Sequence, residues 1–556
     1  MPFTSHLVGD SKSYWDWAGR IAAGDLIGHE VFYQAPFYSY FLGILRSLFG
    51  PSVLAAYLVQ AGLGAVGCVV LYLAARALFS RRAGLIAGLM LALYAPAIFA
   101  DLLIQKETLA VLLTALLCWL IARVLPSVPK QPARSAGLFC LGIGVTLGIL
   151  SITRENALIW IPLLAIWLLL ELRRQRGAAL ALFASGVLIV LGPVALRNYG
   201  IGGELILTTS QLGSNLYIGN GPEADGGYVP MAAGRGNALF ERDDATRLAE
   251  QAEGRKLTAG EVSTYWQKLT RAEIERRPGR FLSLMARKTL FVWNAYEMPD
   301  TQDLYFYQRW SWALRALSAV WHFGVLLPLA AVGVLLTWQR RKTLWIFHAL
   351  VLSLAAAVVV FLVLARYRLP LAPILMLFAA AGAAEAPFLR GKGLTAALVL
   401  AAAVAVFANV QVYPRAPREA MPYYNWGVVL GQEGRTEEAK ARYREAVRIW
   451  PELAEAHYNL GDLYRRSGQL PEAQAALEAA VRARPNYSEA WNSLGLVLRE
   501  RGFLRPACEA ISKSLEQWPD NGPARRNFEL LREAALEAGD GALVAEITRR
   551  QAQRRR

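Results

Sequence analysis

Seven charged side chains at the edges of apolar stretches stand out as candidates for chemistry. The acids are Asp10, Asp101 and Glu107, and the bases are Lys106, Arg154, Arg366 and Arg368. A carboxylate at the edge of a membrane span is costly and is more often functional than one in a soluble protein. Arginine presents a planar fork of donors that suits phosphate oxygens. These residue types indicate a site for a phosphate-bearing ligand at a membrane surface.

Each of these residues also has a plainer interpretation. Asp10 precedes a helical pattern and could act as its N-cap. Glu107 could interact with the positive end of the helix dipole at the start of the next span. Any of the arginines could reach lipid headgroups from a buried stem. The sequence leaves these alternatives open beside the functional ones.

Arg366 and Arg368 form the best-placed basic pair because they lie on a short loop just before Pro370. Residues two apart share a face in an extended chain but are splayed by roughly 200° in a helical turn. We expect the splayed arrangement, with only one of the two arginines directed into a cavity.

Ten apolar stretches approach the roughly 20 residues that a membrane-spanning helix needs. They are 52–78, 84–100, 107–125, 136–153, 156–172, 177–196, 316–338, 343–365, 369–388 and 393–411. Some are near the short limit, and a very tight turn joins 136–153 to 156–172. The sequence therefore predicts a multi-pass membrane protein.

The turns between these stretches alternate in charge, which predicts their sidedness. One set is basic and includes Arg81, Arg82, Arg173, Arg174, Arg176, Arg340, Arg341, Lys342, Arg390 and Lys392. Short loops rich in Lys and Arg stay in the cytoplasm. The acid-containing turns and both ends of the chain are then extracytoplasmic, at the inner membrane. A segment outside at the start normally follows an earlier span, so we expect one before residue 1.

Composition excludes several classes of protein. The chain is 55% hydrophobic, which is too apolar for a soluble protein, and 18% charged, which is too polar for a protein embedded throughout. The net charge of +16 lies largely in the basic turns and in the polar tail, so nucleic-acid binding is not expected. Four cysteines and five histidines show no ligand spacing, and we expect no metal or other cofactor.

The fold class that follows is all-α, a polytopic transmembrane helical bundle with extracytoplasmic loops and a C-terminal α-solenoid. Its predicted parts are a first extracytoplasmic segment (1–50), two halves of the bundle (51–196 and 316–412), an extracytoplasmic loop region (197–315) and a soluble tail (413–556).

The tail repeats itself every 34 residues. The positions in register are Gly427, Gly461 and Gly495; Gly434, Gly468 and Gly502; Ala439, Ala473 and Ala507; and Pro451, Pro485 and Pro519. Small residues suit closely packed helix pairs, and proline ends each second helix. The unit resembles the tetratricopeptide repeat. Such arrays bind peptides or proteins on a concave face, although a purely structural cap on the membrane domain is the alternative.

The membrane part carries a series of short motifs in a fixed order. They include Gly9-Asp10-Ser11, Tyr33-Gln34-Ala35-Pro36, Lys106-Glu107, Arg154-Glu155-Asn156, Leu216-Tyr217-Ile218-Gly219-Asn220 and Arg366-Tyr367-Arg368-Leu369-Pro370. Over roughly residues 10–373 this series resembles the polytopic glycosyltransferases of fold type C. Within that class it is similar to dolichyl-phosphate-mannose protein mannosyltransferases and the bacterial lipid A aminoarabinose transferase.

The resemblance implies a hexosyl or pentosyl transferase that inverts the sugar carbon. Its donor is a polyprenyl-phosphate sugar, and its extracytoplasmic acceptor is a protein or peptide by preference, or a lipid or glycan. It makes Asp10 the general base, with Asp101 and Glu107 as further catalytic candidates. The candidate ligands of the donor phosphate are Lys106, Arg154, Arg366 and Arg368, and those of the rest of the substrate are Tyr14, Tyr33, Tyr38 and Asn220.

Two other functions compete with this one. A non-enzymatic scaffold could recruit envelope proteins through its repeats and would have no need of Asp10. A transporter normally has broken helices and polar groups near the midplane. Here the polar groups gather at one surface, which disfavours transport.

Overall fold

The structure is a computed structural model that describes residues 7, 9–125, 133–173, 175–231, 238–300, 302–518 and 521–555. Arg174 and Pro519 lie outside the described residues. All regular secondary structure in the described part is helical. The chain forms two compact units, one from Leu7–Val229 with Asn237–Val412 and the other built on Tyr413–Arg556. The all-α fold class is confirmed.

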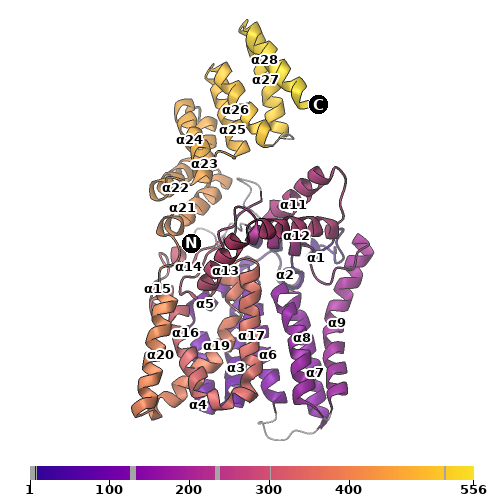
Figure 1. The fold of residues 1–556 in the computed structure, drawn as a ribbon, viewed down its shortest axis with the longest axis vertical. Helices are drawn as coiled ribbons and strands as arrows, with labels where there is room; N and C mark the ends of the chain where they lie inside the picture. The colour runs from indigo at the N-terminus through magenta and orange to yellow at the C-terminus, as the bar shows by residue number, and fades with distance from the viewer. Residues whose placement is uncertain are drawn as a thin grey trace. The chain divides into compact units, whose positions relative to one another are not determined.

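The first unit is a bundle of apolar helices (Figure 1). Among the described residues seven stretches are long and apolar enough to cross a membrane, or eight if a pair bent by 56° is one span. The seven are α3 (Val53–Leu78), α6 (Glu107–Val124), α9 (Arg176–Gly202), α15 and α16 (Trp312–Val320, Phe323–Leu336), η2 and α17 (Trp338–Arg340, Arg341–Val360), α19 and η3 (Leu371–Glu385, Ala386–Phe388) and α20 (Gly391–Asn409). The bent pair is α4 (Arg81–Ala92) and α5 (Ala95–Asp101). The protein is therefore an integral, multi-pass membrane protein.

Two of the ten predicted spans are short in the structure. The stretch 136–153 corresponds to α7 (Ala133–Ser151). The stretch 156–172 is divided into η1 (Glu155–Ile159) and α8 (Trp160–Glu171). One side of each nevertheless packs inside the bundle. Trp160 and Trp167 of α8 are fully buried. Gly144 of α7 lies against α9 so closely that an added Cβ would sit 2.1 Å from the carbonyl oxygen of Phe183.

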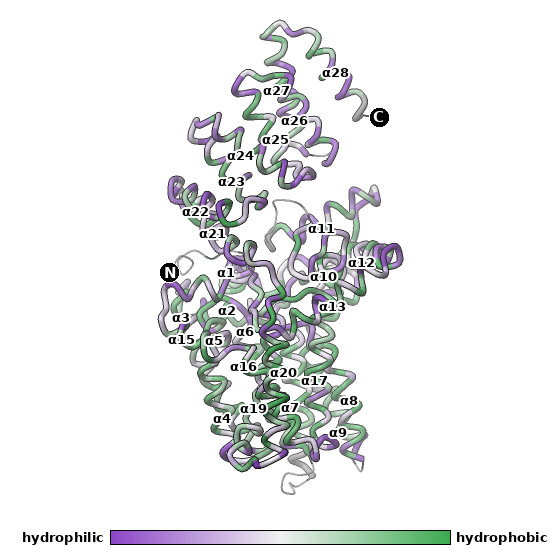
Figure 2. The backbone as a smooth tube through the Cα atoms, turned by 60° about the vertical axis from the view of Figure 1, so that its left-hand side comes forward, coloured by the Kyte–Doolittle hydropathy of each residue, from purple (hydrophilic) through white to green (hydrophobic). Residues whose placement is uncertain are grey.

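Polar helices gather at one end of the bundle, which we call the polar end (Figure 1). They are α1 (Asp10–Ala22), α2 (Phe37–Phe49), α10 (Leu212–Asn220), α11 (Ala238–Glu253), α12 (Ala259–Arg276), α13 (Pro278–Trp293) and α14 (Leu304–Tyr307). Figure 2 shows the contrast, with hydrophobic colour along the bundle and hydrophilic colour in α12. The last short helix of this unit, α18 (Ala365–Arg368), precedes α19. The turns that begin α4 and α20, which carry Arg81 and Lys392, lie at the opposite end (Figure 1).

The second unit consists of paired helices. They are α21 (Arg415–Gln432), α22 (Thr436–Ile449), α23 (Ala454–Arg466), α24 (Leu470–Ala483), α25 (Ser488–Glu500), α26 (Leu504–Gln517), α27 (Gly522–Glu537) and α28 (Gly541–Arg555).

The repeat glycines take the two roles that their spacing predicted. Gly468 turns the chain between α23 and α24 at φ +73°, a conformation that suits glycine. Gly461 and Gly495 face the second helix of their own pair, where an added Cβ would lie 2.6 Å from Leu477 and 2.4 Å from Ile511. The predicted solenoid of tetratricopeptide type is confirmed.

Candidate active site

Asp10 is the first residue of α1, and Gly9 before it turns the chain at φ +57°. Gly9, and not Asp10, therefore holds the N-cap position of α1. The Asp10 carboxylate is buried, and it forms an ion pair with Arg366 of α18. Gln34 donates a hydrogen bond of 3.0 Å to the other carboxylate oxygen. Burial opposes ionisation, but Arg366, Lys106 and Arg154 together outweigh it and hold the pKa of Asp10 below its ordinary value.

Arg366 is the centre of this arrangement. Its guanidinium contacts Asp10, pairs with Asp300 at 3.0 Å and donates to Gln105 at 3.2 Å. Its Nε atom is buried and makes no hydrogen bond with a described residue. A planar fork with one unused donor in a buried position is suited to an oxyanion ligand.

Two further ion pairs lie beside this group at the polar end. Arg154, which precedes η1, pairs with Glu107 at the start of α6. Lys106 lies 3.9 Å from Glu155. The Arg154 guanidinium also stands over the ring of Tyr367, 4.9 Å from its centroid. Burial lowers the pKa of Lys106 to about 8, although Glu155 acts in the other direction. Lys106 and Arg154, both buried, and the partly buried Arg366 thus lie near enough to Asp10 for their charges to act on it. We call Asp10, these three cations and their carboxylate partners the Asp10 cluster.

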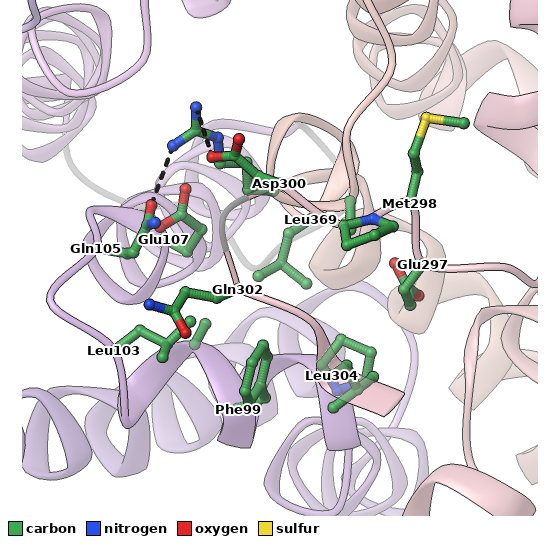
Figure 3. Close-up of a pocket in the computed structure, with 15 residues that line it drawn as sticks. Phe99, Leu103, Gln105, Glu107, Glu297, Met298, Asp300, Gln302, Leu304 and Leu369 are labelled. Atoms are coloured by element: carbon green, nitrogen blue, oxygen red, sulfur yellow. Dashed lines mark hydrogen bonds and ion pairs between the residues drawn. The ribbon is translucent and has the colours of Figure 1, made fainter. Parts of the chain in front are cut away.

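An apolar-walled cavity opens beside this cluster. Glu107, Asp300 and Arg366 contribute to its lining, and the apolar wall includes Phe99 and Leu304. Figure 3 shows Gln105, Glu107 and Asp300 close together on one side of the cavity, with Glu297 on the other. The lining thus combines apolar walls with one cation, Arg366, and three carboxylates, those of Glu107, Glu297 and Asp300.

Arg368 does not join the cluster. Its guanidinium pairs with Glu297 at 2.8 Å and donates to the carbonyl oxygens of Val292 and Tyr296, both at 3.0 Å. The buried Arg368 side chain therefore satisfies carbonyl oxygens at the end of α13 and in the loop that follows. The splayed arrangement is confirmed, because α18 is a single helical turn. The role of Arg368 as a phosphate ligand stays a prediction, and the structure places its guanidinium on Glu297 and backbone carbonyl oxygens.

Asp101 also lies apart from the cluster. It ends α5 and accepts a hydrogen bond of 2.7 Å from Thr108. Its carboxylate faces α3, where an added Cβ on Gly64 would lie 2.3 Å from Oδ2. The structure gives Asp101 a packing position between three helices. It does not bring Asp101 to Asp10, in contrast to the catalytic role that the sequence suggested.

The four predicted substrate ligands divide into two groups. Tyr38 is fully buried and donates to Gln60 at 2.6 Å, and Asn220 is held by the carbonyl oxygen of Val360 at 2.8 Å and by Lys288 at 3.0 Å. Both have hydrogen-bond partners within the protein, and their assignment as substrate ligands stays a prediction. Tyr14 and Tyr33 remain at the site.

Tyr14 lies 5.9 Å below the ammonium group of Lys106, measured to the ring centroid. Tyr33 donates a hydrogen bond of 2.7 Å to Glu241 of α11. These two aromatic residues therefore border the charged cluster from two different segments.

Several residues of the cluster were missed from the sequence. Gln34 and Glu155 stand beside residues that were singled out, so their neighbourhood was a usable signal. Asp300 and Glu241 lie in the long polar stretch between spans, where many similar residues occur. Only the fold brings these two carboxylates to the site. Within the described residues, no group of three or more His, Cys, Asp or Glu is arranged to hold a metal ion.

Comparison with known proteins supports both halves of the chain. Residues 33–196 match the family model described as dolichyl-phosphate-mannose-protein mannosyltransferase. Residues 431–496 match a tetratricopeptide repeat model. No curated protein sequence matches the chain.

Three solved structures illustrate the structural likeness. ArnT from Cupriavidus metallidurans, bound to undecaprenyl phosphate, is 16% identical with a TM-score of 0.41, over 91% of this chain and 76% of that one. The apo oligosaccharyltransferase of Archaeoglobus fulgidus is 14% identical with a TM-score of 0.40, over 76% and 54%. The tetratricopeptide repeat domain of Sgt2 from Aspergillus fumigatus is 27% identical with a TM-score of 0.21, over 22% and 83%.

The two family matches confirm the resemblance that the motifs predicted. The chain joins a region similar to the mannosyltransferase family model, at residues 33–196, to tetratricopeptide repeats. These matches and the apolar spans support a membrane glycosyltransferase that uses a lipid-linked sugar donor.

Proposed function

We propose that this protein transfers a hexosyl or pentosyl group from a polyprenyl-phosphate sugar to an acceptor outside the cytoplasm, at the inner membrane. The observation that carries the proposal is the position of Asp10 among Lys106, Arg154 and Arg366 at the polar end of the bundle. The carboxylate can take a proton, and the three cations can stabilise a phosphate leaving group.

In this proposal the donor phosphate competes with carboxylates for the cations. Arg366 is shared between Asp10 and Asp300 in the structure, and a phosphate that binds Arg366 replaces part of that pairing. Asp10 then loses the charge that holds its pKa low, and it becomes a stronger base. The base is thereby activated where and when a donor is present.

The transfer itself is a single displacement. The acceptor's nucleophilic atom attacks the anomeric carbon from the face opposite the phosphate, and the bond between that carbon and the phosphate oxygen breaks. Asp10 takes the acceptor's proton, and the cations hold the departing polyprenyl phosphate. The sugar carbon is inverted. We propose that no metal is needed, because Lys106, Arg154 and Arg366 supply the positive charge that a metal would contribute.

The repeat unit suits a protein or peptide acceptor, since tetratricopeptide arrays present a concave binding surface. The shape of the pocket determines which sugar is transferred.

The test is a binding and turnover assay on the purified protein in nanodiscs. We expect binding of undecaprenyl phosphate, and turnover of at least one of its mannosyl, glucosyl or galactosyl esters. Arg154→Gln should weaken lipid phosphate binding about tenfold or more, as for a hydrogen bond to a charged group. Arg390→Gln is the control, because Arg390 is an exposed arginine just before α20 at the opposite end of the bundle. Absence of both binding and turnover in the wild type would favour a non-enzymatic scaffold.

A further inference from the structure

A second group of polar side chains meets where α11 lies on the N-terminal segment. Glu241 of α11 accepts hydrogen bonds from the hydroxyls of Tyr33 at 2.7 Å and Tyr228 at 3.2 Å. Ser214 of α10 lies 3.1 Å from the Tyr33 hydroxyl. Glu241, Tyr33 and Tyr228 are only partly buried. We call these three residues the Glu241 cluster.

The Glu241 cluster is linked through the backbone to a residue that contacts Asp10, the proposed general base. Tyr33 is followed in the chain by Gln34, whose amide donates to Asp10 at 3.0 Å and accepts from Ser13 at 3.0 Å. Glu241 is close enough for the charges of Asp10 and Arg366 to act on its ionisation. A continuous series of contacts therefore leads from Glu241 through Tyr33 and Gln34 to Asp10 and Arg366.

The hydrogen-bonding capacity of the cluster defines what it can bind. A carboxylate has about four acceptor sites. Among the described residues, two of those of Glu241 are occupied, both by tyrosine hydroxyls. The remaining sites suit O–H donors and repel an anion. Two tyrosine rings beside the carboxylate add the apolar faces on which a pyranose can lie.

We propose that Glu241, Tyr33 and Tyr228 bind the hydroxyl groups of the donor's sugar and so help to select it. The inference rests on the proposed function and extends it to the substrate's carbohydrate part. The phosphate and the sugar then have separate subsites, one at Lys106, Arg154 and Arg366 and one on α11.

A merely structural role would be to fasten α11 to the N-terminal segment. A second contact already serves that purpose, because the neighbouring Arg242 forms an ion pair with Glu30 in the same segment. Glu30 is exposed and lies outside the Glu241 cluster. This pair supplies a matched control, since Glu30→Gln loosens the same helix and leaves the proposed sugar ligands in place.

The experiment compares lipids with and without a sugar. Binding of undecaprenyl phosphate and of its mannosyl, glucosyl and galactosyl esters is measured on wild type, Glu241→Gln, Tyr228→Phe and Glu30→Gln in nanodiscs. Glutamine keeps the shape of Glu241 and loses its charge. We expect Glu241→Gln to weaken the preferred sugar lipid about tenfold or more and to leave undecaprenyl phosphate unchanged within about twofold. Tyr228→Phe should show the same selectivity with a smaller effect, and Glu30→Gln should change neither lipid.

Sugar lipids that lack one hydroxyl complete the test. The wild type should bind one of these deoxy compounds less tightly than the parent sugar lipid, whereas Glu241→Gln should bind the two equally, as expected for a pair in direct contact.

Four outcomes would overturn the inference. Equal weakening of both lipids by Glu241→Gln and Glu30→Gln would make the cluster a fastening for α11. A change only in the acceptor's KM, with donor binding intact, would assign the cluster to the acceptor. If undecaprenyl phosphate binds normally and none of its sugar esters binds more tightly, the sugar subsite would be excluded while the proposed function would stand. Wild-type protein that binds neither lipid would remove the proposed function as well.

Discussion

At the scale of single residues, the pairing of Asp10 with Arg366 separates donor binding from chemistry. Asp10→Asn should lower turnover by about a hundredfold or more, which is the usual contribution of a general base. It should leave undecaprenyl phosphate binding unchanged or make it tighter, because the carboxylate that competes for Arg366 is gone. The measurement is turnover and lipid binding on the same purified sample. Near-normal turnover would exclude Asp10 as the base and direct the search to Glu107.

The two arginines of α18 should respond differently to the same change. Arg366→Lys loses the fork that contacts Asp10, Asp300 and Gln105, so a higher donor concentration should be needed while thermal stability stays near normal. Arg368→Lys leaves buried carbonyl oxygens without donors, which costs about 1–3 kcal/mol. It should lower the melting temperature with a smaller effect on the donor requirement. Identical profiles for the two variants would contradict the separate roles of these residues.

Sequence reasoning predicted which charged residues meet at this site better than it predicted their geometry. Asp10, Lys106, Arg154 and Arg366 meet in the structure, because residues at the edges of spans on one side are confined to a thin layer. Residue type alone did not separate Arg366 from Arg368. Their separation follows from the helical turn of α18, which directs side chains two apart to different faces.

At the scale of elements, the docking of α11 should depend on pH. Burial raises the pKa of Glu241 from its ordinary value to about 7, and Asp10 acts in the same direction. The docked helix therefore holds a proton that the undocked helix releases near pH 4.5. The stability of docking is complete below that pH and is lost as the pH rises through about 7. The hydroxyls of Tyr33 and Tyr228 and the charge of Arg366 oppose this shift without cancelling it.

Hydrogen exchange measures this effect. After correction for intrinsic rates, amides of α11 should exchange faster at pH 8 than at pH 6, with α24 of the repeat unit as the internal reference. Glu241→Gln should remove the difference. An α11 whose protection is the same at both values in the wild type would show that Glu241 titrates as it does in water.

Element boundaries in this chain followed the hydrophobic pattern where spans were long and departed from it where they were short. The stretch at 52–78 became one helix, α3. The stretch at 84–100 broke into α4 and α5 before Pro96, since proline has no backbone donor to continue the hydrogen bonds of the preceding turn. Hydropathy does not distinguish a straight span from a bent one. The repeats were easier to predict because glycine spacing alone fixed their turns.

At the scale of the whole molecule, the two units should be separable in function. Deleting residues 413–556 leaves the bundle and the whole of the Asp10 cluster in one compact unit. Slow hydrolysis of the sugar donor should therefore continue, whereas transfer to a protein acceptor should fall if the repeats recruit it. The measurement is release of undecaprenyl phosphate with and without acceptor. Equal loss of hydrolysis and transfer would mean that the repeats are needed for the fold of the membrane domain.

The orientation of the chain follows from the parity of its spans and the charge of its turns. The described residues give eight spans if α4 and α5 count as one. If α7 and α8 cross the membrane as a pair, they add two more. The number of spans is even in both cases, so the two ends of the chain lie on the same side. Because the basic turns stay in the cytoplasm, both the Asp10 end and the repeats should lie outside. Alkaline phosphatase, which is active only after export, should be active when fused after residue 412 and inactive when fused at Arg390. Only α20 separates these two fusion points, so the pair controls for expression and insertion. The reverse pattern would place the Asp10 cluster in the cytoplasm and would rule out a donor that is used outside.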